Sequence, residues 1–242
     1  MVNLTIDGQL VEVAEGLTIL DVARECHIRI PTLCHNDALA PYGACRLCMV
    51  EITKNGRSQL VASCLYPVEE GLDVNTNSER VLNSRRMVIE FLLARCPGVK
   101  VIRDLAEEVG VKKTPFKKGD SQCILCGMCV RACQEVVGIG ALGFIGRGVD
   151  REVGTPFFEA SEVCIGCGSC AYACPTGVIR IWDVDDMRFV SMNDVSSWET
   201  KLKLKKCGVC GNYWAPEAQL EYVMKNWNLP SDIFDMCPNC KE

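Results

Sequence analysis

The residues of this chain with the clearest chemical potential are its cysteines. Eighteen occur among the 242 residues, and most of them lie in short groups with regular spacing. In a reducing compartment, cysteine pairs separated by two residues are more typical of metal sites than of disulfides. Thiolates at such spacing can bind zinc, iron or iron–sulfur clusters, so the sequence predicts several metal centres.

The strongest pattern is a repeated C-x2-C-x2-C-x3-C group. Its first copy contains Cys123, Cys126, Cys129 and Cys133, and its second copy contains Cys164, Cys167, Cys170 and Cys174. In such runs three thiolates bind one [4Fe–4S] cluster, while the fourth binds the other cluster. The predicted ligand sets are therefore Cys123, Cys126, Cys129 and Cys174 for one cluster, and Cys164, Cys167, Cys170 and Cys133 for the second.

A different spacing, C-x10-C-x2-C-x15-C, precedes these repeats. It comprises Cys34, Cys45, Cys48 and Cys64. Four thiolates in a loop suit a [2Fe–2S] cluster, and the small residues Gly43 and Ala44 let backbone N–H groups approach the sulfur atoms. We expect Cys26 to be a core residue instead, and His27 and His35 to be ordinary polar residues, because the paired Cys and His units of a Rieske centre are missing.

Two C-x2-C pairs lie near the end of the sequence, at Cys207 and Cys210 and at Cys237 and Cys240. Paired knuckles of this kind hold one tetrahedral ion through four thiolates, and zinc is the commonest occupant. The sequence therefore favours zinc here. Mononuclear iron of the rubredoxin type and a further [4Fe–4S] cluster remain alternatives, because ligand type alone does not separate them.

The elements that must position these cysteines can also be predicted. Alternation around Asp7-Gly8 indicates a hairpin over residues 2–13, and Thr18 with Asp21 resembles a capping pair that starts a helix. Strand-like runs follow at residues 49–52 and 59–62. Helical periodicity covers residues 78–94, and a second short helix is expected at about 103–109.

The later connecting segments are less regular. Residues 112–119 are basic and contain Pro and Gly, which is typical of a linker. Between the two cysteine repeats, residues 141–145 and Phe157-Phe158 could form an inserted hairpin. After Ile181 the sequence becomes charged, and we expect irregular structure there.

Composition limits the function classes. The net charge is −5 and, apart from the short basic linker at 112–119, no basic block is evident, which argues against nucleic-acid binding. The start of the sequence lacks a signal-peptide pattern and no run is long enough to span a bilayer, so we expect a cytoplasmic protein without membrane insertion. A hydrophobic content of 48% suggests that partner subunits cover part of the surface.

These motifs resemble those of a known family. The segments 31–35 (PTLCH), 44–51 (ACRLCMVE) and 123–126 (CILC) are similar to the N-terminal iron–sulfur region of the large, 75 kDa-type subunit of respiratory complex I. They are even more similar to the small diaphorase subunit of NAD-linked bidirectional hydrogenases. The resemblance covers roughly residues 1–182.

The resemblance has one internal departure. The family usually places a His-x3-C-x2-C-x5-C site between its [2Fe–2S] and ferredoxin parts. Here Cys96 is the only cysteine of the corresponding segment, residues 92–102, and it cannot hold a cluster alone. The C-terminal knuckles also lie outside the usual pattern of this subunit.

Together the motifs and the resemblance imply an α+β chain in five parts. These are a plant-type ferredoxin β-grasp domain with the [2Fe–2S] cluster (1–78), a helical linker (79–118), a bacterial-type two-[4Fe–4S] ferredoxin domain (119–184), a linker (185–205) and a small zinc-ribbon or rubredoxin-like knuckle module (206–242).

The resemblance implies an electron-transfer subunit within a hetero-oligomeric oxidoreductase. A flavin-containing, NADH-oxidising partner would supply single electrons, and a catalytic oxidoreductase subunit or a ferredoxin would receive them. The catalytic subunit could be of hydrogenase, formate dehydrogenase or low-potential reductase type. No nucleotide-binding motif or catalytic triad is evident, so we expect no substrate site on this chain.

Three alternatives stay open. A succinate dehydrogenase-like iron–sulfur subunit also combines plant-type and bacterial-type clusters, although its first cysteine pair is closer in sequence. A redox-sensing protein could contact nucleic acid through the knuckles, and a self-sufficient enzyme would carry flavin itself.

Overall fold

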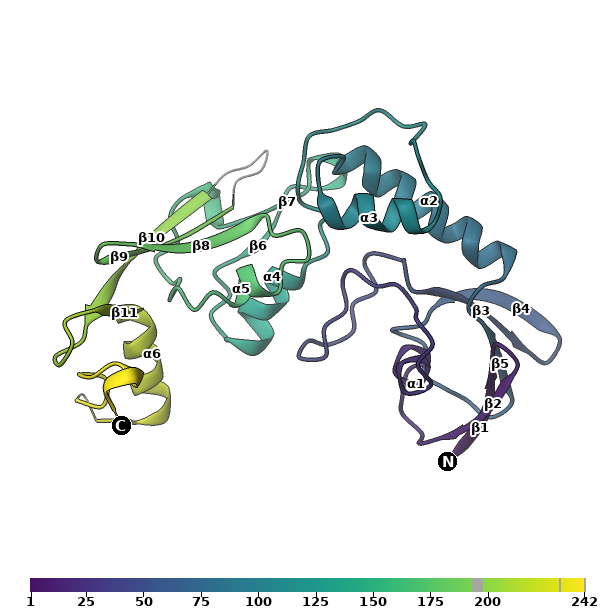
Figure 1. The fold of residues 1–242 in the computed structure, drawn as a ribbon, viewed down its shortest axis with the longest axis horizontal. Helices are drawn as coiled ribbons and strands as arrows, with labels where there is room; N and C mark the ends of the chain where they lie inside the picture. The colour runs from purple at the N-terminus through teal and green to yellow at the C-terminus, as the bar shows by residue number, and fades with distance from the viewer. Residues whose placement is uncertain (193–197, 231, 242) are drawn as a thin grey trace. The chain divides into compact units, whose positions relative to one another are not determined.

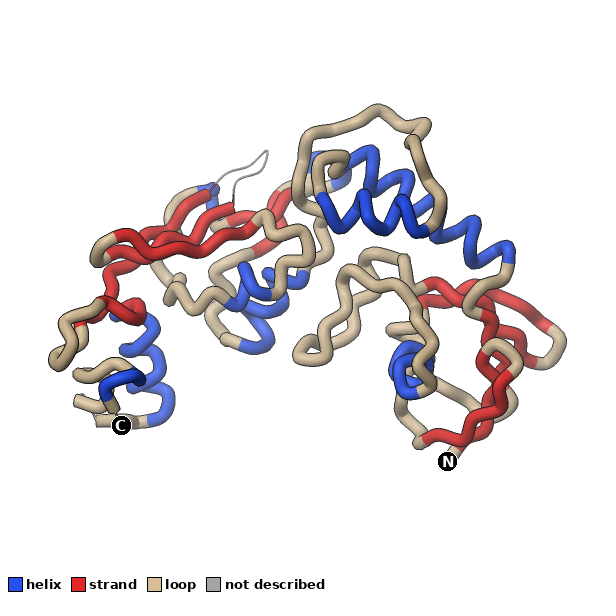
Figure 2. Tube along the Cα trace, viewed as in Figure 1, coloured by secondary structure: helices blue, strands red, loops and turns tan. Residues whose placement is uncertain are grey.

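The computed structural model describes residues 1–192, 198–230 and 232–241. The chain divides into two compact units, Met1–Cys126 and Gly127–Glu242. Within these units Figures 1 and 2 show a mixture of helices, strands and long loops. Among the described helices, none is both long enough and apolar enough to cross a membrane.

The first unit is built on a five-stranded sheet of order β2-β1-β5-β3-β4. Its strands are β1 (Val2–Ile6), β2 (Gln9–Val13), β3 (Met49–Lys54), β4 (Arg57–Ala62) and β5 (Leu72–Asn75). β1 and β2 form the predicted hairpin, whereas β1 and β5 run parallel. The predicted strand runs are thus confirmed, and the parallel pairing makes the first strand part of a larger sheet.

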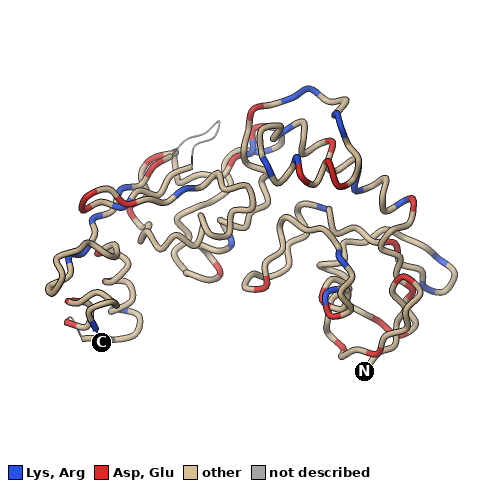
Figure 3. Tube along the Cα trace, in the orientation of Figure 1, with Lys and Arg blue, Asp and Glu red and all other residues tan. Residues whose placement is uncertain are grey.

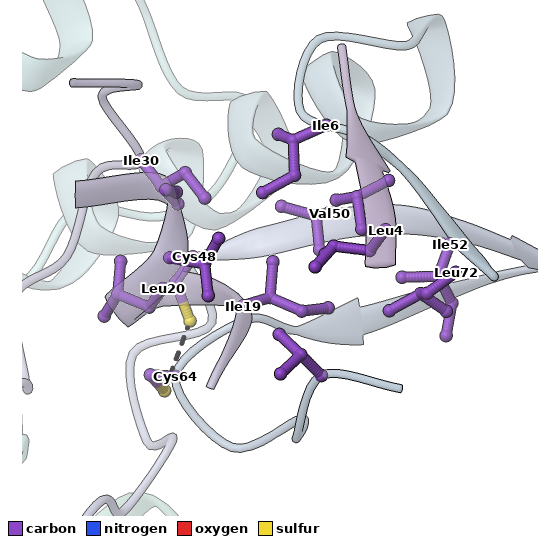
Figure 4. Close-up of a cluster of buried hydrophobic side chains, with 14 of the residues drawn as sticks. Leu4, Ile6, Ile19, Leu20, Ile30, Cys48, Val50, Ile52, Cys64 and Leu72 are labelled. Atoms are coloured by element: carbon purple, nitrogen blue, oxygen red, sulfur yellow. Dashed lines mark hydrogen bonds between the residues drawn. The ribbon is translucent and has the colours of Figure 1, made fainter. Parts of the chain in front are cut away.

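Helix α1 (Ile19–Glu25) packs its apolar face against this sheet. It begins at the predicted capping pair, where the Thr18 hydroxyl accepts from the Asp21 N–H and the Asp21 carboxylate accepts from the Thr18 N–H. Figure 4 shows Ile19 and Leu20 of the helix among side chains of the sheet, next to Cys48 and Cys64. Cys26 ends the helix and packs against the same core, as predicted.

Two further helices, α2 (Glu79–Arg95) and α3 (Lys100–Glu108), complete the first unit. Ser78 caps α2, which confirms the predicted helix, and α3 starts three residues before its expected position. Ile89 and Ile102 form a second core with Cys96, Leu33 and Leu47. The basic loop after α3 is visible in Figure 3, while charges of both signs occur throughout both units.

The second unit begins with short elements around the cysteine repeats. They are α4 (Met128–Arg131), the π-helical turn η1 (Ala132–Val136), β6 (Gly143–Ile145), the 3-10 turn η2 (Gly148–Asp150), β7 (Glu152–Gly154), the 3-10 turn η3 (Pro156–Phe158) and α5 (Ser169–Tyr172). The inserted hairpin exists, but its second strand is β7 rather than Phe157-Phe158. Pro156 lacks a backbone N–H, and this part of the chain turns instead of pairing.

A four-stranded sheet of order β11-β10-β9-β8 follows. It contains β8 (Ile179–Val184), β9 (Met187–Met192), β10 (Trp198–Lys206) and β11 (Tyr213–Pro216), and it is followed by α6 (Glu217–Trp227) and the 3-10 turn η4 (Pro238–Cys240). The prediction of an irregular linker at 185–205 was therefore wrong for residues 187–192 and 198–205, while its part at 193–197 lies outside the described residues. β10 alternates buried and exposed side chains, and this period of two marks a half-buried strand despite its many lysines.

The hairpin turn is tied to the end of β5 by one carboxylate. Asp7 accepts hydrogen bonds from the N–H and hydroxyl of the buried Thr76, at 2.7 Å and 2.6 Å.

We expect Asp7→Ala to lower the free energy of unfolding by about 1–3 kcal/mol, because both Thr76 groups lose their acceptor. Asp7→Asn keeps one acceptor and suits the left-handed backbone (φ 48°), so it should cost less. Chemical denaturation followed by circular dichroism would measure both; equal losses would contradict this role.

Candidate iron–sulfur and metal sites

The four cysteines predicted to hold a [2Fe–2S] cluster lie around the loop before β3 and the end of β4. The Sγ atoms of Cys48 and Cys64 are 3.3 Å apart, as the dashed line in Figure 4 shows. The Cys45 N–H donates to the Cys34 Sγ at 3.3 Å. Cys34, Cys48 and Cys64 are buried and Cys45 is half-buried, so these sulfur atoms are largely shielded from water.

The proximity of these thiols controls their ionisation. The hydrogen bond between the Cys48 and Cys64 thiols lowers the pKa of Cys48 to about 6. The same contact raises the pKa of Cys64, and the contact with Cys34 raises that of Cys45. Since like charges at this distance oppose each other, full ionisation of the four thiols requires a positive metal centre among them. The donor set therefore fits an iron–sulfur cluster.

Backbone geometry lets the loop fold closely around this site. Arg46 adopts a left-handed conformation (φ 58°) between Cys45 and Cys48. At Gly43 (φ 68°) a Cβ atom would collide with the Leu65 side chain. The buried Arg85 of α2 donates to the carbonyl oxygens of Leu47 at 3.2 Å and Met49 at 2.9 Å, which fixes the loop to the helix.

The two cysteine repeats share one local backbone geometry. The second residue after the first cysteine is left-handed in both copies, at Leu125 (φ 54°) and Gly166 (φ 70°). A left-handed glycine then precedes each short helix, Gly127 before α4 and Gly168 before α5. This agreement extends the sequence repeat to the backbone and is consistent with two equivalent cluster-binding loops.

One cavity in the second unit is lined by four cysteines from both repeats. They are Cys133, Cys164, Cys167 and Cys170, the ligand set predicted for the second [4Fe–4S] cluster. The Ala141 N–H donates to the Cys133 Sγ at 3.3 Å. Burial raises the pKa of Cys170 to about 12 and also raises that of Cys164, with further contributions from neighbouring thiols. The cavity is otherwise lined mainly by apolar side chains and backbone, which suits a bound inorganic cluster.

The other predicted set is distributed over both units. Cys123 and Cys126 end the first unit, whereas Cys129 and Cys174 belong to the second. Locally, the Leu125 N–H donates to the Cys123 Sγ at 3.4 Å, and the Cys174 Sγ lies 3.4 Å from the Thr176 hydroxyl. The assignment of these four residues to one cluster stays a prediction.

The C-terminal knuckles bring their four cysteines together. The sulfur atoms of Cys207, Cys210, Cys237 and Cys240 all lie within 4.8 Å of one another. Backbone N–H groups, foremost that of Cys237, lower the pKa of Cys207 to about 6, whereas thiol contacts raise that of Cys240 to about 12. Such a group of thiols can bind a metal ion.

Sequence reasoning missed the contribution of β9 and β10. Val190, Trp198 and Thr200 line the cavity of the second cysteine set, although they lie in the segment predicted to be a linker. The signal was present in the alternation of Trp198, Thr200, Leu202 and Leu204 with charged residues. His35, by contrast, contacts Asp37 and Arg24 through its Nε2, in line with an ordinary polar role.

Comparison with known proteins identifies iron–sulfur domains over the segments that contain the two kinds of cluster motif. Residues 1–79 match the family of 2Fe-2S iron-sulfur cluster binding domains, and residues 122–178 match the family of 4Fe-4S dicluster domains. A crystal structure of an NAD+-reducing [NiFe]-hydrogenase in the H2-reduced state superposes with a TM-score of 0.56 and 32% identity, over 64% of this chain and 74% of that chain.

Two curated relatives are also similar to part of this chain. The NADP-reducing hydrogenase subunit HndD of Solidesulfovibrio fructosivorans is 37% identical over 178 residues, and the NADH-ubiquinone oxidoreductase 75 kDa subunit of Reclinomonas americana is 36% identical over 180 residues. These alignments cover 61% and 64% of this chain, but only 30% and 26% of the relatives. The chain thus spans less than a third of each of these two relatives.

The contact of Arg85 with the [2Fe–2S] loop can be tested by substitution. We expect Arg85→Met to destabilise the protein by about 1–3 kcal/mol, because two carbonyl oxygens lose a buried donor. The visible absorption of the [2Fe–2S] centre should then be lost at a lower temperature. Arg86→Met is the matched control, since within the described part of the chain that guanidinium bonds only the nearby Asn83, on the exposed surface. Equal behaviour of the two variants would refute the anchoring role.

Proposed function

We propose an electron-relay function for this chain, which belongs to the family of iron–sulfur electron-transfer subunits of hydrogenase-type and complex I-type NAD-linked oxidoreductases. In this proposal a flavin-containing, NADH-oxidising partner delivers single electrons. The chain passes them to a catalytic oxidoreductase subunit or to a ferredoxin. It works in the cytoplasm as part of a hetero-oligomer.

The cavity lined by Cys133 together with Cys164, Cys167 and Cys170 carries the proposal. In a two-cluster ferredoxin, each cluster is expected to take three ligands from one repeat and one from the other, and this cavity has that arrangement. The match of residues 122–178 to the dicluster family supports the same assignment. Clusters held in this way exchange single electrons with little change of geometry.

The side chains around the sites serve this task by excluding water, and backbone groups serve it by donating hydrogen bonds to sulfur. The N–H groups of Cys45 and Ala141 donate to Cys34 and Cys133 respectively. Such bonds favour added negative charge on the metal centre and therefore help to set its potential. Rigid packing of the loops keeps these donors in place when the charge changes.

The proposed route lacks one station that the family usually has. Cys96 lies fully buried in the core between α2 and α3. It therefore serves packing in this position. We propose that electrons move between the [2Fe–2S] and [4Fe–4S] centres without the additional cluster that a site of one histidine and three cysteines would hold.

For the C-terminal knuckles we propose a single zinc ion in a zinc-ribbon-like module. Four sulfur atoms around a tetrahedral zinc ion, each about 2.3 Å from the metal, are about 3.8 Å apart. The Sγ atoms of Cys210 and Cys237 are 3.8 Å apart. A [4Fe–4S] cluster separates its ligands further, because each sulfur binds a different iron atom. A structural role follows, since all four positions of the ion would be filled.

Metal analysis of the purified protein tests the relay proposal. Anaerobic preparations should contain about ten irons, about ten sulfides and about one zinc per chain. Dithionite reduction should produce EPR signals of one [2Fe–2S] and two interacting [4Fe–4S] centres, whereas NADH alone should not reduce the chain. About two irons or fewer in cluster-replete preparations, or NADH oxidation by the isolated chain, would refute the proposal.

The interleaved ligand set makes a separate prediction. Cys133→Ala and Cys164→Ala should each remove about four irons, and the double variant should also remove only about four, because both residues ligate one cluster. The [2Fe–2S] EPR signal serves as an internal control for folding. A loss of about eight irons in the double variant would show that the two residues belong to different clusters.

A further inference from the structure

Trp198 is a buried residue of the cavity that holds the second cysteine set. It opens β10, its exposed fraction is 4%, and it lines the cavity together with Cys133, Cys164, Cys167 and Cys170. Among the described residues, its indole Nε1 has no hydrogen-bond partner. A buried N–H without an acceptor costs about 1–3 kcal/mol, so an acceptor within the site is expected.

The sheet to which Trp198 belongs holds the second cysteine loop close to its strands. The Arg188 Nη1 of β9 donates to the Gly166 carbonyl oxygen at 3.3 Å, and the same guanidinium binds both oxygens of Asp183, at 2.7 Å and 2.8 Å. A Cβ atom at Gly166 would lie 3.0 Å from the Leu202 Cδ1 of β10 and 2.9 Å from the Pro216 Cγ of β11. Only a glycine permits this approach, so the sheet and the loop form one packed unit.

Trp198 also borders the surface. Together with Gly168 it lines both the cysteine cavity and an open groove that includes Tyr172 and Trp182. The indole therefore stands between the cavity and solvent. In this position it excludes water from one side of the site, and the low polarity of the lining strengthens any hydrogen bond made there.

We propose that the Trp198 indole N–H donates a hydrogen bond to a sulfur atom of the [4Fe–4S] cluster held by Cys133, Cys164, Cys167 and Cys170, and that this bond raises the reduction potential of the cluster. The proposal rests on the relay function, since it needs a cluster at this ligand set. It assigns a redox role to a segment beyond residue 178, where the match to the dicluster family ends.

The direction of the change in reduction potential follows from the negative charge that the cluster gains on reduction. Reduction of the cluster by one electron, supplied by dithionite in the test, adds one negative charge and no proton. A donor N–H stabilises the more negative reduced form more than the oxidised form, so removal of the donor makes reduction harder. The consequence for the relay is that this cluster holds an electron more strongly than its cysteines alone would dictate.

Trp198→Phe removes the N–H and keeps an aromatic side chain between cavity and groove. We expect the midpoint potential of this cluster to fall in an EPR-monitored redox titration of the full chain. A fall of about 59 mV corresponds to a tenfold decrease in the equilibrium constant for accepting one electron. Trp182→Phe is the matched control: Trp182 lies on β8, is 40% exposed, and stacks on Phe189.

A second measurement detects the bond directly. Protein with 15N in its indole rings should show a hyperfine coupling from one indole nitrogen to the reduced cluster in pulsed EPR. The coupling should be absent in Trp198→Phe and retained in Trp182→Phe. Full iron content in both variants would exclude loss of fold as the cause.

The outcomes separate this inference from the proposed function. Wild-type protein without [4Fe–4S] EPR signals would refute the relay and, with it, the role of Trp198. Normal signals with the same potential in Trp198→Phe as in wild type, and no indole coupling, would refute the role of Trp198 alone. A lowered potential with loss of the coupling would establish it.

Discussion

One constraint underlies the structure: cysteine thiols that repel one another once they lose their protons must be brought together in small spaces that hold little water. The pKa of Cys170 is raised to about 12 mainly by burial, and those of Cys45 and Cys64 are raised through contacts with neighbouring thiols. Protons leave such groups readily only when a metal centre balances the negative charge. Assembly of the metal centres and folding of the surrounding loops are therefore linked, and the small apolar cores need not stabilise these loops alone.

The same constraint explains the backbone around the sites. Several N–H groups must point at sulfur atoms within a few residues, which calls for left-handed residues such as Arg46, Leu125 and Gly166. Helices near the repeats are correspondingly short, as α4 and α5 have four residues each. Larger elements support the loops: α1, α2 and the five-stranded sheet in the first unit, and the four-stranded sheet in the second.

The knuckle site differs from the cluster sites in its spacing and in its relation to the fold. Its four sulfur atoms lie close enough for one ion. β10 connects the knuckle site to the cavity of the second cysteine set, because this strand begins at Trp198, which lines that cavity, and leads into Cys207 at its other end. In addition, the Tyr222 hydroxyl of α6 donates to the Val137 carbonyl oxygen at 2.7 Å, four residues after Cys133. A structural ion at the knuckles would thus stabilise elements that pack beside a redox site.

The sequence by itself determined the kinds of chemistry and the local elements. Cysteine spacing identified the [2Fe–2S] and two-cluster motifs, and capping and turn residues placed the first hairpin and helices, because these signals act over a few neighbouring positions. Features that depend on contacts between residues far apart in the sequence were decided only by the tertiary structure. The alternation within residues 198–205 indicated a strand, but the partners of that strand and the position of Trp198 at a cysteine cavity depended on strand pairing and packing. No local pattern encodes such contacts uniquely, because their energy comes from groups that meet only in the folded chain.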